Sequence, residues 1–577
     1  MAALILLPSY GISQTATINP SKPVDLTTGK VSRPPVSAKE FLVVSANPLA
    51  SEAGQQMLEK GGSAVDAMIV VQLVLGLVEP QSSGIGGGAF LVHWDNENKS
   101  LTTFDGRETA PLAATPDHFL DDNGDPVSFG FAVIGGRSVG TPGVVALLEA
   151  AHQRYGKLTW EELFQPAIEL ADKGFAVSAR LNDNITASAE SLFLFPATRT
   201  YFLSEEGVPL FEGTVVTNPA YRDTLREIAK NGAKAFYQGD IAGDIVATIA
   251  NAPANPGLLT LEDFENYQIF EREPVCVEYR TYEICGMGLP SSGGLTIGQI
   301  LKLVEPYDLP AMGPNDLHSW RIIGDATRLA FADRNVYMAD ADFVKIPGGL
   351  LDDNYLSGRS NLLGSSEALA EEKIQPGEPP WDDAQNYGVD QSLEIPSTSH
   401  VSIVDSDGNI VSLTTSIESR FGSRLMARGF LLNNQLTDFS FVPDVDGVPV
   451  ANRVEPGKRP RSSMSPTIVF KDGSPIFVIG SPGGSRIIAF VAKTLIAHLD
   501  WGMGVQEAIE LPNLVNRYGT FELELDTAAE DLQHAFEALG YPVRSNRLES
   551  GLQGIEILQD GLVGGADPRR ESLALGR

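Results

Sequence analysis

Thr398 lies at the start of a segment whose hydroxyl residues could take part in acyl-transfer chemistry. Polar and apolar residues alternate on both sides of residues 405–409, which predicts a β-hairpin with Gly408 at positive φ. In that register Ser416 lies opposite Thr398, so that two hydroxyl groups meet at the end of a sheet. Facing Thr and Ser residues are also common in ordinary sheets, and the pair alone therefore predicts only the hairpin.

Two glycines supply the second kind of group that acyl transfer requires. A predicted strand in "VIGSPGGSRII" ends at Gly483 and Gly484, where backbone N–H groups can approach a ligand because no Cβ intervenes. Two such donors can stabilise a tetrahedral oxyanion. Polar side chains on two other predicted loops complete the set: Ser462 and Ser463 before a strand, and Gln435 and Asp438 on a turn after a strand.

Two glycine motifs point to other chemistry, and both are better interpreted as structural. Residues 84–88 lack the Lys-Ser/Thr of a nucleotide-binding loop and follow a helix rather than a strand. Residues 136–140 match the nucleophile elbow of α/β-hydrolases, but residues 141–143 delay the next helix by about a turn. The elbow stays an alternative, in which Ser138 rather than Thr398 is the nucleophile.

The elements that must position these residues alternate between helix and strand without a repeat, which predicts an α/β (α+β) fold. An apolar run at 67–78 predicts a buried helix whose first turn Ser63 can cap. Thr141 and Thr159 are expected to cap two further helices. Residues 351–391 lose the pattern and are expected to form a long exposed segment before Thr398.

The composition excludes several classes of partner. About 43% apolar and 20% charged residues are typical of a globular protein of one large or several conventional domains. With 42 basic and 74 acidic residues the net charge is −32, which argues against nucleic acid and anionic lipid, because both require a basic surface. No stretch reaches the ~20 apolar residues of a membrane-spanning helix.

The cysteines and the N-terminal segment bear on the compartment. Cys276 and Cys285 flank two alternating runs, and the register of that hairpin sets them opposite each other, within disulfide reach. Buried thiols in a reducing compartment are the alternative. Residues 1–38 form a lead whose apolar start resembles a truncated signal segment. We expect a periplasmic or secreted protein, otherwise a cytoplasmic one.

No metal or other cofactor is expected. The two cysteines and seven scattered histidines have no spacing of the kind that metal ligands show. The chemistry of the segments above needs hydroxyl groups, backbone N–H donors and a base, all of which the chain can supply itself. We therefore expect no added group.

The chain as a whole resembles the γ-glutamyltranspeptidase family, also called glutathione hydrolases. The motifs that carry the resemblance follow in order over nearly the whole length: "SGIGGGAF", "DGRETAP", "SVGTPG", "PSSGG", "TSHVSIVDSDGN", "LLNNQLTDFS", "RPRSSMSPTI" and "GSPGGSRII". The resemblance implies an N-terminal nucleophile hydrolase sandwich with four αββα layers. It also implies that the precursor cuts itself between Ser397 and Thr398. A large subunit, 39–397, and a small subunit, 398–577, then remain together as a heterodimer.

The resemblance assigns the chemistry to the new N-terminus. Thr398 would be the nucleophile, and its freed α-amine, with a reference pKa of ~7.7–8.0, would be the base. Ser416 corresponds to the hydroxyl residue that steadies it, and Gly483 and Gly484 correspond to the oxyanion donors. Glutathione or another γ-glutamyl amide would form a γ-glutamyl ester, which water or the amine of an amino acid or peptide then accepts.

The resemblance also assigns the binding residues. Arg107, Ser462 and Ser463 correspond to a clamp for the substrate α-carboxylate, for which a guanidinium fork is well suited. Asp438 and Gln435 correspond to the α-ammonium site.

One departure and two alternatives bear on specificity. Glu418 stands where many family members have Asn, and would either strengthen the ammonium site or shift preference away from glutathione. A cephalosporin or glutaryl-amide acylase on the same scaffold would keep Thr398, Gly483 and Gly484 but recognise an acyl group without the α-amine. A binding protein that kept the fold without activity is the alternative of another class, and the intact Thr398 disfavours it.

Overall fold

The computed structural model describes residues 33–382, 384–393 and 397–577. Most of the predicted N-terminal lead, residues 1–32, lies outside the described residues. Among the described residues, no helix combines the length and the apolar character needed to cross a bilayer.

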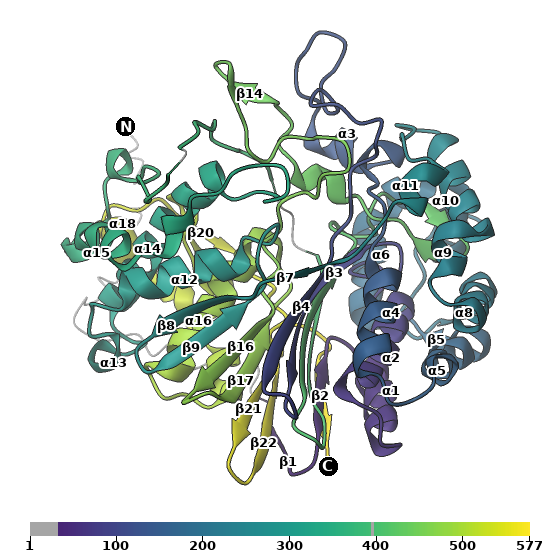
Figure 1. Ribbon diagram of the computed structural model, residues 1–577, viewed down its shortest axis with the longest axis horizontal. Coiled ribbons are helices and arrows are strands. Elements are labelled where there is room, and N and C mark those ends of the chain that lie inside the picture. Colours follow the sequence, from purple (N-terminus) through teal and green to yellow (C-terminus); the bar gives the residue numbers. More distant parts are fainter. Residues whose placement is uncertain (1–32, 383, 394–396) are drawn as a thin grey trace, which may run out of the picture.

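Two seven-stranded sheets, antiparallel throughout, form the centre of the molecule (Figure 1). The first has the order β23-β2-β10-β11-β3-β4-β7: Leu573–Gly576, Leu42–Ser45, Ser399–Val404, Ile410–Ser416, Gly88–Asp95, Ser100–Gly106 and Phe270–Arg272. The second has the order β1-β22-β21-β17-β16-β9-β8: Val36–Ala38, Gly561–Ala566, Gln553–Leu558, Ser474–Gly480, Thr467–Lys471, Tyr282–Gly286 and Val275–Tyr279. Both sheets contain strands from before and after residue 398.

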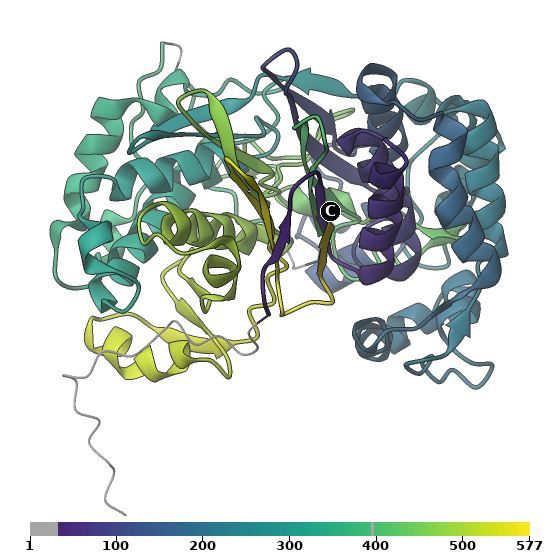
Figure 2. The same cartoon turned by 90° about the horizontal axis from the view of Figure 1, so that it is seen from below.

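The sheets pack against each other, and helices cover their outer faces (Figures 1 and 2). Strands β10 and β11 contact β17 and β21 across the interface between the sheets. On the outside of the first sheet lie α1 (Pro48–Glu59), α2 (Ala64–Val78) and α4 (Val144–Tyr155). On the outside of the second lie α12 (Gly293–Val304), α16 (Ile487–Leu499) and α17 (Val505–Glu510). The arrangement holds β10 and β11 in the middle of the molecule.

Local signals account for most of the helix starts. Ser63 and Asp66 form a capping box at the start of α2, and every residue of that helix except Gly76 is buried, as its apolar run predicts. Thr159 is the N-cap residue of α5 (Trp160–Lys173), where its N–H and its hydroxyl both donate to Glu162 Oε2. The prediction for Thr141 is wrong, because its N–H donates to the Thr109 carbonyl in an isolated bridge and α4 begins only at Val144.

The segment before Thr398 is better packed than its sequence predicts. Residues 353–360 form α15 (Asp353–Ser360), and residues 361–364 continue as a 3₁₀ turn. Single leucines anchor the segment to the core of the second sheet: Leu356, Leu363 and Leu369 are buried there. The expectation of a wholly exposed segment over 351–391 is therefore wrong, because widely spaced apolar residues without periodicity still suffice to fix a loop.

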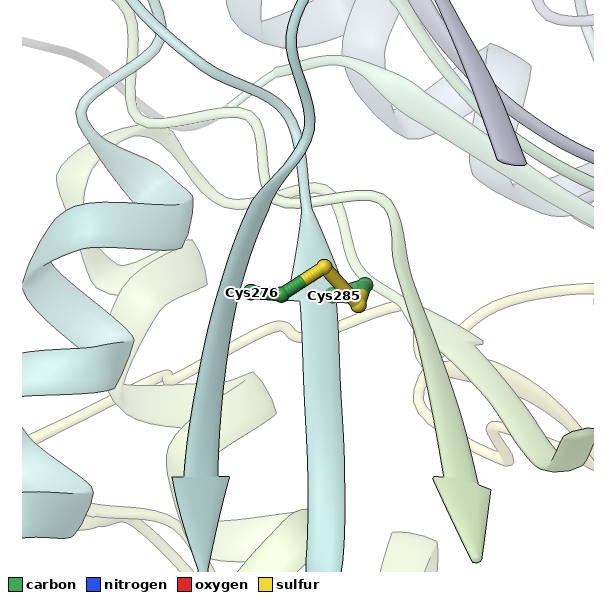
Figure 3. Close-up of a disulfide and its surroundings, with 2 residues drawn as sticks. All are labelled: Cys276 and Cys285. Carbon is green, nitrogen blue, oxygen red and sulfur yellow. A yellow bond between two sulfur atoms is a disulfide. The ribbon is translucent and has the colours of Figure 1, made fainter. Parts of the chain in front are cut away.

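Cys276 of β8 lies directly opposite Cys285 of β9, as the sequence register predicts. Their Cα atoms are 4.1 Å apart and a disulfide joins their sulfur atoms (Figure 3). Glu283 places a carboxylate beside these sulfurs, but oxidised sulfurs offer no thiolate to a metal ion.

Candidate active site

The central hairpin brings the two predicted hydroxyl groups together. Ser399 pairs with Thr415 in the β10–β11 register, which sets Thr398 beside Ser416. The Oγ1 atom of Thr398 lies 3.0 Å from the Oγ atom of Ser416, and both residues are buried. The backbone N–H of Glu418 donates to Ser416 Oγ at 2.9 Å and fixes this serine hydroxyl in place. The predicted hairpin and its register are confirmed.

The glycine turn at residues 84–88 packs closely against the backbone of this hairpin at Ser416. A Cβ added to Gly87 would lie 2.0 Å from the carbonyl oxygen of Ser416, and one added to Gly86 would lie 2.1 Å from that of Leu431. The turn therefore permits a close backbone approach that another residue would block. Its predicted structural role is confirmed.

Thr398 has a strained backbone. Its φ is +92°, a region that is rarely adopted by a β-branched residue. The groups on either side are tied down: Arg570 Nη1 donates to the carbonyl oxygen of Thr398 at 2.8 Å, and Ser397 Oγ donates to the carbonyl oxygen of Gln81 at 2.9 Å. Strain of this kind, worth on the order of 1–3 kcal/mol, persists only where surrounding contacts impose it. Here it falls beside the peptide bond that the sequence predicts to be cut.

A small cavity of about 20 Å³ opens beside the Thr398 hydroxyl. Its lining contains all the predicted site residues except Gly483 and Ser397: Arg107, Thr398, Ser416, Glu418, Gln435, Asp438, Ser462, Ser463, Met464, Gly484 and Ile487. These residues come from six separate segments, and only the packing of the two sheets brings the segments together. The volume is close to that of one water molecule, so an acyl group can enter only when the paired side chains move apart.

Opposite charges meet at one end of this small cavity. Arg107 follows β4, and its Nη2 atom donates to Asp438 Oδ2 at 2.5 Å, while Gln435 Nε2 donates to the same oxygen at 2.6 Å. Asp438 and Gln435 share one 3₁₀ turn (Gln435–Asp438), as predicted. The guanidinium of Arg107 also donates to the carbonyl oxygens of Pro460 and Arg461 and is almost wholly buried.

Ser462 and Ser463 lie on the loop before β16, beside the Arg107 guanidinium group. Ser462 Oγ accepts the N–H of Met464 at 3.1 Å, which leaves the Ser462 hydroxyl proton available to donate. Ser463 Oγ accepts a hydrogen bond from Arg334 Nη2 at 2.7 Å. Sequence reasoning missed Arg334, which lies within the buried helix α14 (Leu317–Tyr337), where a buried arginine can only be recognised once its partners are known.

One glutamate lines the small cavity and a second lies behind Arg107. Asn434 Nδ2 donates a hydrogen bond to Glu418 Oε2, which holds this carboxylate at the cavity wall. Glu108 is fully buried behind Arg107, with Oε2 3.9 Å from the Nη1 atom of that arginine. Burial raises the pKa of Glu108 to about 8, although Arg107 acts in the opposite direction. Glu108 is therefore largely protonated at neutral pH, and the Arg107 charge remains directed at Asp438.

The two predicted oxyanion glycines lie between β17 and α16. Gly483 has φ +143° and Gly484 has φ +59°, both favoured by glycine, and a Cβ on Gly483 would lie 2.8 Å from the Phe490 ring. Neither N–H donates to a protein acceptor among the described residues. Gly484 lines the small cavity and Gly483 lines a larger one next to it. Gly484 thus offers a free donor in the cavity of the Thr398 hydroxyl, and Gly483 offers one in the neighbouring cavity.

The nucleophile elbow at Ser138 is not formed. Ser138 Oγ donates to the carbonyl oxygen of Val133 at 2.9 Å and is buried within the 3₁₀ turn Gly136–Ser138. A short helix, α3 (Phe129–Val133), precedes it where an elbow requires a strand. Ser138 lines neither cavity beside Thr398.

Arg570 was not assigned a role from sequence. It lies in the C-terminal segment "GGADPRRES" and is almost fully buried, with its guanidinium donating to the carbonyl oxygens of Thr398 and Ser550. A pair of arginines after a strand gives no local sign of this contact, because the contact joins residues 172 positions apart in the chain.

Comparison with known proteins gives a consistent result. The family model described as Gamma-glutamyltranspeptidase matches residues 50–576. The glutathione hydrolase proenzyme of Bacillus subtilis (strain 168) is 36% identical over 551 residues, which cover 93% of this chain and 92% of that one. The glutathione hydrolase proenzyme of Escherichia coli (strain K12) is 36% identical over 579 residues, with 98% and 97% coverage. The crystal structure of cephalosporin acylase from Bacillus halodurans shares the fold, with a TM-score of 0.81 at 24% identity over 98% of this chain and 99% of that one.

Proposed function

The chain belongs to the γ-glutamyltranspeptidase family, and on that premise we propose that it is a self-processing γ-glutamyltransferase and glutathione hydrolase. The observation that carries the proposal is the Thr398–Ser416 hydroxyl pair, which opens on a cavity that also holds Arg107 and Asp438. Both glutathione hydrolase proenzymes named above support the activity, since each is aligned with more than nine-tenths of this chain.

We propose that the precursor matures by cleavage between Ser397 and Thr398. Thr398 Oγ1 attacks the carbonyl carbon of Ser397, the C–N bond breaks as a C–O ester bond forms, and the hydroxyl proton passes to the nitrogen. Water then hydrolyses the ester, which leaves a carboxylate on Ser397 and a free amine on Thr398. The positive φ of Thr398 supports this step, because cleavage would relieve that strain.

The two products would stay together as a heterodimer with the N-terminal nucleophile hydrolase fold. Residues 39–397 and 398–577 both contribute strands to both central sheets, so that neither part can leave without breaking both sheets. The four layers of helix, sheet, sheet and helix described above correspond to the αββα sandwich expected for such enzymes.

Catalysis would then proceed from the new N-terminus. The α-amine of Thr398 accepts the proton of its own hydroxyl as Oγ1 attacks the γ-carbonyl carbon of the donor. The N–H groups of Gly483 and Gly484 stabilise the oxyanion, and the Ser416 hydroxyl holds Oγ1 in line. The amide nitrogen leaves as an amine after taking the proton from the α-ammonium group. Water or a second amine attacks the γ-glutamyl ester and releases Thr398.

Substrate recognition would exchange one ion pair for two. The α-carboxylate of a γ-glutamyl group takes the place of Asp438 at the Arg107 guanidinium, and the α-ammonium group takes the place of Arg107 at Asp438. The Ser462 hydroxyl donates to the carboxylate, and Gln435 and Glu418 support the ammonium side. A glutaryl group lacks the ammonium charge and would leave the buried Asp438 without a cation.

Donor anilides and mass spectrometry test this proposal together. Intact-mass spectra should show two fragments that meet between Ser397 and Thr398 in the natural chain and one uncut chain in Thr398→Ala. The processed protein should release p-nitroaniline from γ-glutamyl-p-nitroanilide faster than from glutaryl-p-nitroanilide. Ser138→Ala is the matched control and should retain both processing and activity. A preference for the glutaryl compound would overturn the γ-glutamyl assignment in favour of an acylase.

We also propose that the protein works in the periplasm or outside the cell. The Cys276–Cys285 disulfide supports this location, because disulfides persist mainly in oxidising compartments. Cell fractionation followed by thiol labelling should recover the protein outside the cytoplasm with both cysteines protected. Recovery in the cytoplasm with two reactive thiols would contradict the proposal.

A further inference from the structure

A cavity of about 520 Å³ adjoins the small cavity where Ser397 meets Thr398. We call it the arginine cavity, because six arginines from five segments of the chain line it: Arg180, Arg420, Arg424, Arg486, Arg547 and Arg570. Among its described lining residues Glu549 is the only carboxylate. Such a concentration of positive charge stands out in a chain whose net charge is −32.

Two of these arginines form close ion pairs with described carboxylates, and four do not. Arg180 pairs with Glu79 and Glu549, and Arg486 pairs with Glu522. The other four arginines form no close ion pair with any described carboxylate: Arg420, Arg424, Arg547 and Arg570. Arg420 and Arg547 are exposed, so their charges face the solvent of the cavity mouth.

The two deeper arginines lie near other cations. Burial lowers the pKa of Arg424 to about 10, with Arg420 acting in the same direction and Glu418 against it. Burial likewise lowers the pKa of Arg570 to about 10; the nearby Arg180 adds to the effect, and Glu79, Glu549 and Asp567 act against it. Bringing like charges together costs free energy, which a bound anion would recover.

The arginine cavity lies on the side of Thr398 where the leaving amine of the donor must be. Ser397 lines this cavity and Thr398 lines the small one, so the nitrogen of Thr398 lies at the boundary between them. Likewise, Gly483 lines the arginine cavity and Gly484 lines the small cavity. In the reaction at Thr398 the donor C–N bond breaks, and the leaving nitrogen takes its proton from the α-ammonium group of Thr398. A leaving group must therefore lie on the Ser397 side when the acyl group occupies the small cavity.

We propose that the arginine cavity binds the leaving amine and the acceptor amine through their carboxylates, and so selects acidic amino acids and peptides on this side of the reaction. The inference rests on the proposed acyl transfer at Thr398 and adds to it a specificity for the leaving and acceptor amines. Guanidinium groups are suited to carboxylates because their N–H donors form paired, charge-assisted hydrogen bonds. With several arginines available, an amine with two or three carboxylates should bind better than one with a single carboxylate.

Donors that differ only in the leaving amino acid provide the test. With the processed protein, kcat/KM for γ-glutamyl-glutamate should exceed that for γ-glutamyl-alanine, and that for γ-glutamyl-lysine should be lowest. The preference should shrink as salt rises, because exposed charges are screened. In the variant Arg420→Glu/Arg547→Glu the ratio of glutamate to lysine donor should fall about tenfold or more, since two partly exposed charges are reversed.

Matched variants separate this effect from folding. Arg226 is exposed on α8 (Pro219–Asn231) and lies in neither cavity, so that Arg226→Glu should leave the donor ratio unchanged. The milder Arg420→Gln should lower the ratio in the same direction by less. Equal use of the three donors by the natural protein, or the same shift in Arg226→Glu, would overturn the inference while leaving the proposed function intact. Failure to release glutamate from every donor would overturn both.

Discussion

The two cavities that meet at Thr398 arrange their charges in opposite ways. In the small cavity Arg107 and Asp438 form a buried pair, whereas the arginine cavity carries an excess of one sign, partly in contact with solvent. A buried pair is costly to break unless a ligand replaces both partners, which makes recognition of the acyl group stringent. Exposed charges of one sign discriminate between ligands by ligand charge more than by ligand shape, and salt screens this attraction. The contrast predicts strict acyl specificity and graded leaving-group specificity.

Replacement of the group that both cavities share should have the largest effect. Thr398→Ala should abolish cleavage and lower kcat/KM for γ-glutamyl-p-nitroanilide by at least about 10⁴-fold, because no nucleophile remains. Intact mass and glutamate release measure the two losses. Thr398→Ser keeps a hydroxyl and should still be cut, and an active, cut alanine variant would show that another residue is the nucleophile.

Removing the negative charge of Asp438 from the small cavity should weaken recognition of the γ-glutamyl group. Asp438→Asn keeps a polar side chain of the same size but leaves the Arg107 charge unpaired. We expect kcat/KM for the γ-glutamyl anilide to fall about 10²- to 10³-fold, with a smaller loss for the glutaryl anilide. Asp446→Asn, on the exposed turn between β14 (Asp444–Val445) and β15 (Val448–Pro449), is the control. Equal losses for both anilides would mean that Asp438 does not read the α-ammonium group.

A side chain at the boundary between the cavities should disturb catalysis and stability together. In Gly483→Ala the new Cβ meets the Phe490 ring, and a φ of +143° is unfavourable for alanine. Displacement of one oxyanion donor should lower kcat about 10²-fold. Kinetics on the processed fraction, with a thermal melt beside it, will measure both. Gly243→Ala, where no atom lies within 4 Å of the added Cβ, should leave kcat unchanged.

The protonated glutamate behind Arg107 should affect stability rather than rate, and so have the smallest effect on activity. Because the pKa of Glu108 is raised to about 8 in the folded chain, the folded chain holds a proton that the unfolded chain loses near pH 4.5. This term therefore destabilises the fold as pH rises from about 4.5 to 8 and is constant above that range.

The variant Glu108→Gln removes that titration. Its free energy of unfolding should fall less with pH across this range than that of the natural chain, as measured by denaturant titration at several pH values. The exposed Glu97→Gln should behave like the natural chain. Parallel pH profiles for Glu108→Gln and the natural chain would contradict a protonated Glu108.

Local signals predicted those parts of the fold that neighbouring residues control. The β10–β11 hairpin followed from alternation and one positive-φ glycine, and the Cys276–Cys285 register followed from the same logic. The predicted cap at Thr141 was wrong because Thr109, distant in the chain, engages its backbone. The packing of residues 353–364 was missed because isolated leucines carry no periodic signal.

The same division applies to the site. The sequence by itself determined which residues can react, since Thr398, Ser416 and the paired glycines are placed by short motifs and by hairpin register, and the family resemblance supplied the roles of Arg107 and Asp438. Only the tertiary structure decided that Arg107 and Asp438 pair directly, that Arg570 holds the carbonyl of Thr398, and that six arginines surround one cavity. The first two contacts join residues 331 and 172 positions apart through the stacking of two sheets, and neither hydrophobic periodicity nor charge spacing along the chain encodes which distant segments will meet.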